Sequence, residues 1–263
     1  MQKAFLSDEQ WARVEPLLPK ERSRGRPWAE NRRVLEGILW VLKTGARWRD
    51  LPKEYPSAST CWRRLRQWEE RGIWLKIWRA FLSELDQRGK LDWSESFLDG
   101  SFAPAKKGAS ELAKPSGAKA RSGWWWSTAK VFLWEANWSR PARGEVTLAE
   151  STLAQISVPR GGRGRPQKRP LRVVADRAYD SDPLRERLLK RGMLLISPHR
   201  RGRTKPAFND GRWLRRYRQR WKVERTFAWL GNFRRLLVRY DYHLQMYEAF
   251  FHLACIIITL RSL

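Results

Sequence analysis

The sequence LRVVADRAYD (residues 171–180) gives the strongest indication of the architecture, because a short apolar run ends there at an acidic residue, Asp176. A helical segment follows over 182–190, with a proline in its first turn, and a second apolar run, LLIS, occupies 194–197. Strand, helix and strand at this spacing predict an α/β layer. An aspartate directly after a buried strand lies at the solvent mouth of the sheet, where ligands bind in such layers.

The segments on either side of this layer differ from it in pattern. Upstream, Phe97 and Leu98 are another short strand candidate, and a second acidic residue, Asp99, follows them directly. Residues 1–90 carry amphipathic helical patterns, and residues from about 210 to 260 return to helix. We therefore expect an α/β protein of the α+β type, with a helical domain over 1–90 and a mixed sheet flanked by helices over 94–263.

Basic residues gather on one helix of the N-terminal domain. One apolar helical pattern ends at Gly45, and a basic helix follows over about 59–70. This arrangement resembles a helix-turn-helix unit whose second helix carries Arg63, Arg64 and Arg66, side chains that would contact DNA in a major groove. A small helical bundle with a solvated basic face explains the same pattern, so both interpretations stay open.

The composition indicates a polyanionic partner. The chain has 54 Lys and Arg against 27 Asp and Glu, a formal net charge of +27, and a phosphate backbone is the commonest polyanion. The basic residues are spread along the chain, which argues against a membrane-surface helix. Two cysteines and three histidines are too few for a disulfide framework or an imidazole metal site. With no apolar leader in this sequence, we expect a cytoplasmic, nucleoid-associated protein that binds double-stranded DNA and no membrane.

A short basic string, RGRP, occurs twice, at 24–27 and at 163–166. Extended Arg-Gly-Arg is narrow enough to enter an A/T-rich minor groove, where the negative potential is deepest. We predict that Arg163 and Arg165 contact DNA in this way. A flexible linker that happens to be basic is the simpler alternative.

Three acidic residues stand in separate contexts in this basic chain: Asp99, Asp176 and Glu224. Cutting and joining of phosphodiesters commonly uses two Mg²⁺ ions about 4 Å apart, and these ions prefer carboxylate oxygen. Two aspartates at strand ends and one helical glutamate are sufficient for such a site. Taken alone, Glu224 is better explained as part of a surface ion pair, so the prediction depends on the three contexts together.

Four stretches of the sequence match one known family: GILWVLKTGARWRDLP (37–52), LDGS (98–101), ADRAYD (175–180) and residues 220–230. In these stretches, and over nearly its whole length, the chain resembles bacterial insertion-sequence transposases of the DDE class, in the IS-four/IS-five group. The resemblance implies an RNase H-like catalytic domain whose metal-binding triad is Asp99, Asp176 and Glu224. It also implies two Mg²⁺ ions, for which Mn²⁺ can substitute, and a homodimer on DNA.

The same resemblance assigns a helical signature in which a tyrosine, an arginine, a glutamate and a lysine follow at fixed spacing. Tyr217, Arg220 and Glu224 match its first three positions, and the first two are implied DNA contacts. The lysine position falls on Gly231, which departs from the family pattern. Arg235, one turn further on, is our candidate to supply the missing charge to DNA.

Residues 111–144 match neither this family nor a strand pattern, and they include WWW at 124–126. Tryptophan has the single codon TGG. Three TGG codons in a row, read in the frame that starts at the third base, encode two valines, and the codons that follow permit the string Val-Val-Val-Asp-Gly. Such a strand is what the resemblance leads us to expect here. We therefore suspect a compensated pair of frame changes, in the gene or in its sequencing. The alternative is a true insertion whose tryptophans stack on bases.

These observations favour a DNA transposase that binds the terminal inverted repeats of its element and carries out Mg²⁺-dependent strand cleavage and strand transfer, or a copy that has lost this activity. A non-catalytic helix-turn-helix DNA-binding protein is the main alternative, and a nuclease without strand transfer is another.

Overall fold

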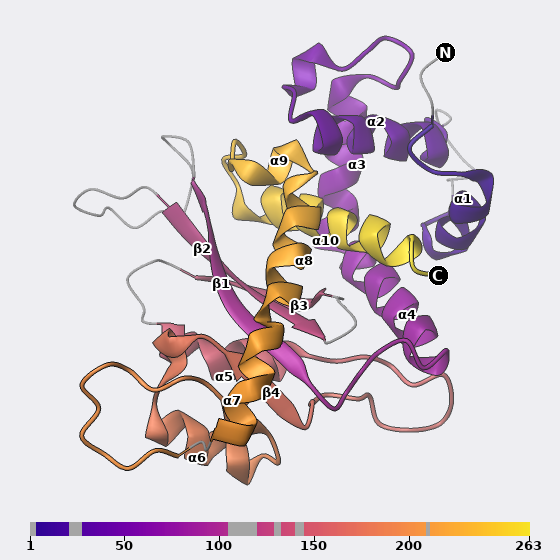
Figure 1. The fold of residues 1–263 in the computed structure, drawn as a ribbon. Helices are drawn as coiled ribbons and strands as arrows, with labels where there is room; N and C mark the ends of the chain where they lie inside the picture. The colour runs from indigo at the N-terminus through magenta and orange to yellow at the C-terminus, as the bar shows by residue number, and fades with distance from the viewer. Residues whose placement is uncertain (1–3, 21–27, 105–119, 129–132, 140–144, 209–210) are drawn as a thin grey trace. The chain divides into compact units, whose positions relative to one another are not determined.

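The computed structural model describes residues 4–20, 28–104, 120–128, 133–139, 145–208 and 211–263 (Figure 1). The chain divides into two compact units. The first contains the described parts of Met1–Phe81 together with Leu230–Leu263, and the second contains Leu82–Pro104 and the described parts of Glu111–Trp229.

The described residues of the first unit form helices. They are α1 (Asp8–Val14), the 3₁₀ helix η1 (Glu15–Leu17), α2 (Asn31–Thr44), η2 (Trp48–Asp50), α3 (Ala58–Glu70), the first part of α4 (Ile73–Gln87), α9 (Arg234–Leu237) and α10 (Leu244–Leu260). The helix ends predicted at Gly45 and over 59–70 are confirmed within one residue.

Local sequence sets the ends of these helices. At the start of α1, the Ser7 hydroxyl accepts from the Gln10 amide at 3.2 Å, and the Gln10 side chain accepts from the Ser7 amide at 3.1 Å. Gly45 ends α2 in the left-handed conformation, with φ of 70°. A Cβ added at Gly45 would also lie 3.0 Å from the Cβ of Arg234. Both the backbone conformation and the close approach therefore require glycine.

The core of the first unit is aromatic. Trp68, Trp74 and Trp78 are fully buried, and the rings of Trp68 and Trp74 meet edge to face with centroids 5.1 Å apart. Helix α10, buried on nearly all sides as its apolar sequence predicts, packs against α3. This helix belongs to the first unit, whereas the sequence placed 94–263 in one domain. An apolar helix does not reveal in its own sequence which surface it covers.

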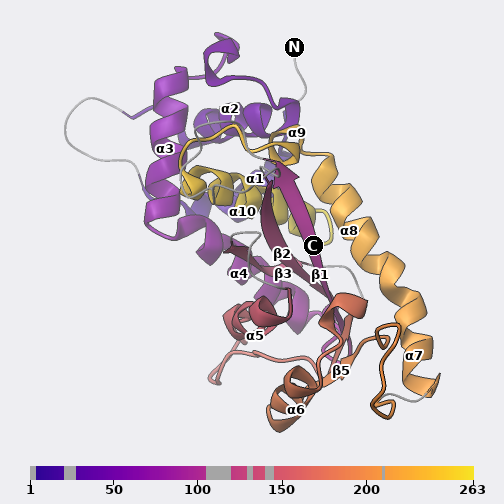
Figure 2. The ribbon, with the colours of Figure 1, turned by 90° about the vertical axis from the view of Figure 1, so that its left-hand side faces the viewer.

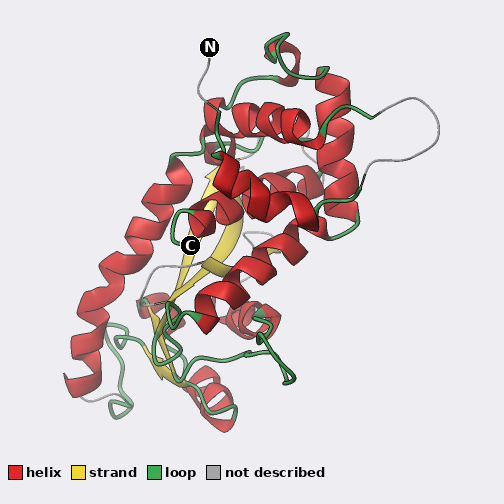
Figure 3. Ribbon diagram, turned by 90° about the vertical axis from the view of Figure 1, so that its right-hand side faces the viewer, coloured by secondary structure: helices red, strands yellow, loops and turns green. Residues whose placement is uncertain are grey.

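All strands of the described chain belong to the second unit (Figure 3). The elements that begin in this unit are β1 (Ser96–Pro104), β2 (Ala120–Thr128), β3 (Leu133–Ser139), α5 (Glu145–Gln155), β4 (Arg172–Ala175), η3 (Arg177–Tyr179), α6 (Asp182–Lys190), β5 (Leu194–Ile196), α7 (Gly211–Tyr217), η4 (Arg218–Arg220) and α8 (Trp221–Gly231). The predicted strand–helix–strand segment is confirmed as β4, α6 and β5.

The five strands form one mixed sheet in the order β3-β2-β1-β4-β5. Strands β1, β2 and β3 pair antiparallel, and β1, β4 and β5 pair parallel. The sheet lies between helices: α7 and α8 run along one face, and α5 lies on the other (Figure 2). A mixed sheet flanked by helices is therefore confirmed.

A small apolar cluster attaches α8 to the sheet. Its fully buried members are Phe97 on β1, Val174 on β4, Ile196 on β5 and Val223 on α8. Burying one such side chain contributes roughly 1.5–3 kcal/mol. The cluster fixes the rotation of α8, and with it the direction in which the polar residues next to Val223 point.

The tryptophan-rich segment forms strands at the level of the backbone. β2 pairs antiparallel with β1, so that Trp125 lies opposite Asp99, and β3 pairs with β2. The expectation that this segment lacks strands is wrong for 120–128 and 133–139, because backbone hydrogen bonds do not require alternating apolar side chains. The rest of 111–144 lies outside the described residues, and the frame-change hypothesis concerns the gene and stays a prediction.

No helix in the described ranges is both long enough and apolar enough to cross a bilayer.

Candidate active site

Asp99 and Asp176 come together on two adjacent parallel strands: Asp99 lies within β1, and Asp176 directly follows β4. In the β1–β4 pair, Leu98 lies opposite Ala175, so each aspartate is the next residue along its own segment. They are close enough for the charge of Asp176 to raise the pKa of Asp99. The sequence placed both at strand ends. This is confirmed for Asp176 and wrong for Asp99, because β1 continues past Asp99 to Pro104 by pairing with β2.

Asp99 is a buried carboxylate with an internal counter-ion. One oxygen accepts from the Gly100 amide at 3.0 Å, and the other accepts from Nη2 of Arg220 at 2.7 Å. Burial raises the pKa of Asp99, and the Asp176 charge adds to this effect. The hydrogen bonds and the positive charge of Arg220 act in the opposite direction, but the net shift is upward.

Arg220 links Asp99 to the helical signature. Its Nη1 donates to the hydroxyl of Tyr217 at 3.3 Å, and its buried Nε has no hydrogen-bond partner. Burial lowers the pKa of this guanidinium, but Asp99 and Tyr217 together outweigh burial and raise it. Arg220 is therefore a permanent positive charge within hydrogen-bonding distance of a candidate metal ligand.

Asp176 is positioned by its own backbone and by the segment after β5. Its Oδ1 accepts from the Ala178 amide at 2.9 Å, which caps η3. Its carbonyl accepts from the buried hydroxyl of Ser197 at 2.6 Å. The sequence analysis did not single out Ser197, and its position at the end of the LLIS run is the only signal that favoured it.

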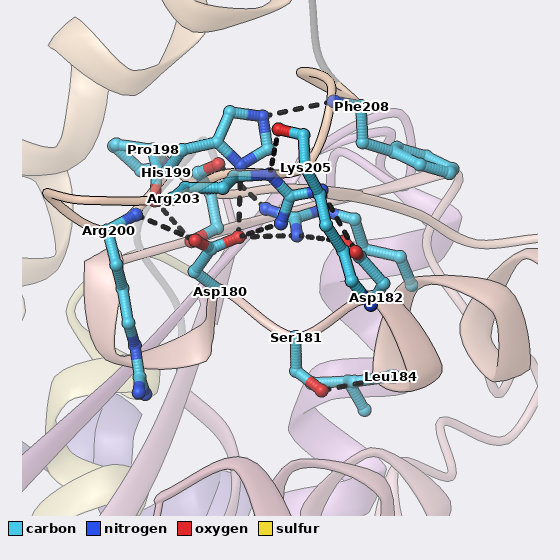
Figure 4. A network of polar contacts seen from close by, with 12 residues as sticks. Asp180, Ser181, Asp182, Leu184, Pro198, His199, Arg200, Arg203, Lys205 and Phe208 are labelled. Atoms are coloured by element: carbon cyan, nitrogen blue, oxygen red, sulfur yellow. Dashed lines mark hydrogen bonds and ion pairs between the residues drawn. The ribbon is translucent and has the colours of Figure 1, made fainter.

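A network centred on Asp180, four residues after Asp176, ties this part of the chain to α6 and to the segment after β5 (Figure 4). Asp180 accepts from Arg185 at 2.6 Å and from the Arg200 amide at 2.7 Å, and it lies 3.0 Å from Nδ1 of His199. Because Nε2 of His199 accepts from the Phe208 amide at 3.1 Å, Nδ1 carries the proton and donates to Asp180. Burial alone would raise the pKa of Asp180, but these donors outweigh it and hold the pKa at about 2.

Glu224 lies on α8, the helix that begins directly after Arg220, and is not joined to Asp99 or Asp176. It is exposed on α8, four residues after Arg220 and next to buried Val223. Two neighbouring carboxylates on adjacent strands, such as Asp99 and Asp176, suit a hard divalent cation. However, no three His, Cys, Asp or Glu side chains in the described parts of the chain lie close enough to hold one. As it stands, the arrangement does not fit a metal ion held by all three residues.

The three arginines predicted to read DNA from α3 differ in their surroundings. Arg63 is exposed, and Arg66 is exposed and pairs with Glu70 at 2.7 Å. Arg64 is buried: its guanidinium lies 3.8 Å from the ring centroid of Trp28 and donates to Asn31 at 2.8 Å. The prediction of a DNA contact by Arg64 is corrected, because its donors serve the fold.

Arg235 requires the same correction. It is 4% exposed and donates to Asp241 at 2.8 Å and to the Ala46 carbonyl at 3.2 Å. It therefore joins α9 to the end of α2 and does not present its charge to DNA. By contrast, Arg163 and Arg165 are exposed in the loop after α5, while the first RGRP string, at 24–27, lies outside the described residues.

Family models match both ends of the chain. Residues 6–78 match the model described as "Putative transposase of IS4/5 family", and residues 143–260 match the model described as "Transposase DDE domain". Asp176 and Glu224 fall inside the second range, and Asp99 falls between the two. DDE transposases in general depend on divalent metal ions.

Two relatives from Burkholderia cepacia agree with these matches. The "Insertion element IS402 uncharacterized 16.2 kDa protein" is 41% identical over 43% of this chain and 82% of its own length. The "Putative transposase for insertion sequence element IS402" is 41% identical over 45% of this chain, which covers 53% of that relative. The chain belongs to the insertion-sequence transposases of the IS4/5 family.

A solved structure supports the fold. The piggyBac transposase in its synaptic complex with hairpin DNA aligns with 98% of this chain and 73% of its own, at a TM-score of 0.51 and 11% identity. At this level of identity the likeness concerns the fold alone.

Proposed function

We propose that this transposase cuts and joins DNA strands at a site formed by Asp99, Asp176 and Glu224, on an RNase H-like sheet. One observation carries the proposal: two carboxylates directly follow the parallel pairing of β1 with β4, which ends with Leu98 opposite Ala175. Carboxylates brought together in this way are the usual ligands of metal ions that act on phosphates. Helix α8, attached by Val223 to the same sheet, carries the third carboxylate.

The cofactor in this proposal is a pair of Mg²⁺ ions, for which Mn²⁺ substitutes. Such ions activate the attacking oxygen and stabilise the leaving oxygen of an in-line displacement. The protein's own contribution is positional. The Ala178 amide and the Ser197 hydroxyl fix Asp176, and the Gly100 amide fixes one oxygen of Asp99.

The proposed partner is double-stranded DNA, both at the ends of the element and at the target, bound by a homodimer. Support comes from the net charge of +27 and from the exposure of Arg63, Arg66, Arg163 and Arg165. Tyr217 and Arg220 are further proposed contacts next to the cleavage site. Because many phosphates would be contacted, affinity should fall steeply between low and physiological salt.

The test is cleavage of a duplex that carries the element's own ends, with and without Mg²⁺, followed by addition of a target duplex. Asp176→Asn should abolish both nicked and joined products while the protein still binds DNA. Glu150→Gln, which removes a partly exposed ion pair with Arg187 elsewhere in the second unit, should change neither. Mg²⁺-dependent products from the Asp176→Asn protein would reject the assignment.

A second candidate, a DNA-binding protein without catalysis, is favoured by one observation: the described residues hold no ready-made metal site. The suspected frame change over 111–144 points the same way, and it agrees with matched ranges that stop at 78 and resume at 143. Sequencing the gene and assaying a frame-corrected protein beside this one separates the two. If neither protein yields a Mg²⁺-dependent product, the non-catalytic candidate stands.

A further inference from the structure

Both oxygens of Asp99 are already engaged within the protein. The Gly100 amide donates to one and Arg220 donates to the other, at 3.0 and 2.7 Å. The ion pair joins residues 121 positions apart in the sequence, and the side chain of Asp99 is 11% exposed. A cation that approached this carboxylate would meet a fixed positive charge at hydrogen-bonding distance, with little water to screen it.

This pairing engages one of the three carboxylates of the proposed site. Arg220 lies on the turn of helix that precedes Glu224, so the two share one side of that segment. The guanidinium therefore supplies the positive charge that the Asp99–Asp176 pair would otherwise obtain from a metal ion. The buried carboxylate of Asp99 needs such a charge, because a carboxylate removed from water is costly without a counter-ion.

We propose that the Arg220–Asp99 ion pair is a gate: it closes the site to divalent cations in the DNA-free protein and opens when a DNA phosphate takes over Arg220. This inference rests on the proposed function, since it concerns the regulation of that same site. Arg220 thereby acts as a positioning residue that ties metal entry to the presence of the substrate.

The hydrogen bonding of Arg220 shows why a phosphate can displace Asp99. A guanidinium has five N–H donors, yet Arg220 makes one short bond to Asp99 and one of 3.3 Å to Tyr217, while Nε makes none. A phosphate offers several charged oxygens in a geometry that accepts two parallel N–H bonds. The exchange lets Arg220 use more of its N–H donors in hydrogen bonds, and it frees one oxygen of Asp99 to bind a metal ion.

Binding of Mn²⁺, followed by the loss of the free-ion paramagnetic resonance signal, tests the gate without measuring activity. The proteins are the full chain and its Arg220→Gln variant, each titrated with MnCl₂ alone and with a short DNA duplex present. The matched control is Arg216→Gln. It removes a similar ion pair, to Glu95 at 3.1 Å, from the preceding turn of the same segment, and Glu95 is not a proposed ligand.

Without DNA, Arg220→Gln should bind Mn²⁺ at least about tenfold more tightly than the unaltered protein, the factor expected for releasing one charged hydrogen bond. DNA should tighten Mn²⁺ binding by the unaltered protein and by Arg216→Gln, but not by Arg220→Gln. Equal DNA-free affinities of all three proteins would overturn the gate and leave the metal site in place. If no protein binds Mn²⁺ even with DNA, the proposed function fails together with the gate.

Discussion

Replacing Asp180 by asparagine removes the negative charge and one of the two acceptor oxygens at the centre of the network in Figure 4. The side chain is 3% exposed and pairs with the fully buried Arg185. Its pKa is about 2, against an ordinary 3.8, so the ionised form contributes about 2 kcal/mol to stability at neutral pH. Because the folded-state pKa is the lower one, this contribution is complete above about pH 4 and is lost as the pH falls toward 2.

The assay is denaturant unfolding of both proteins, followed by tryptophan fluorescence at pH 7 and at pH 3. The difference in free energy of unfolding should be about 2 kcal/mol at pH 7 and about half that at pH 3. Asp182→Asn is the comparison, because Asp182 contacts the same arginine at 3.2 Å and its side chain is 21% exposed. This substitution should lower the free energy of unfolding by less than Asp180→Asn does. A difference that is the same at both pH values would refute this account of Asp180.

Two further predictions concern the first unit. Gly45→Ala should lower the free energy of unfolding of this unit by about 1–3 kcal/mol. Gly72→Ala should lower it by less, because both glycines have positive φ but only Gly45, of the two, has a neighbour within 4 Å of an added Cβ. Equal decreases of the melting temperature in the two variants would rule out a contribution from the close contact with Arg234. Arg63→Ala should weaken DNA binding and reduce the slope of log affinity against log salt concentration by about one, without changing the unfolding midpoint. Arg64→Ala should instead lower the unfolding midpoint, and an unchanged midpoint would restore Arg64 as a DNA contact.

The sequence revealed those features of the fold that depend on neighbouring residues. The strand end before Asp176 and the helix end at Gly45 follow from local patterns, and the structure confirms them. The strand end predicted before Asp99 is wrong, because β1 continues to Pro104. The pairing of β2 with β1 was missed, because a run of tryptophans does not alternate and its hydrogen bonds are made by backbone.

The features that sequence patterns missed depend on partners far along the chain. Arg64 finds Trp28 and Asn31, and Arg235 finds the carbonyl of Ala46, 189 residues away. All exposed and buried arginines look alike in a sequence this basic, so the pattern does not separate those that read DNA from those that serve the core. For the same reason, the sequence did not predict the pairing of Arg220 with Asp99.

The most direct test of the central claim is to replace Mg²⁺ with Fe²⁺ and let hydroxyl radicals cut the polypeptide next to the bound ion. With DNA carrying the element's ends, the account predicts cuts close to Asp99, Asp176 and Glu224, all suppressed by excess Mg²⁺. Cuts confined to other segments, or no metal-dependent cuts at all, would contradict a shared metal site at these three carboxylates.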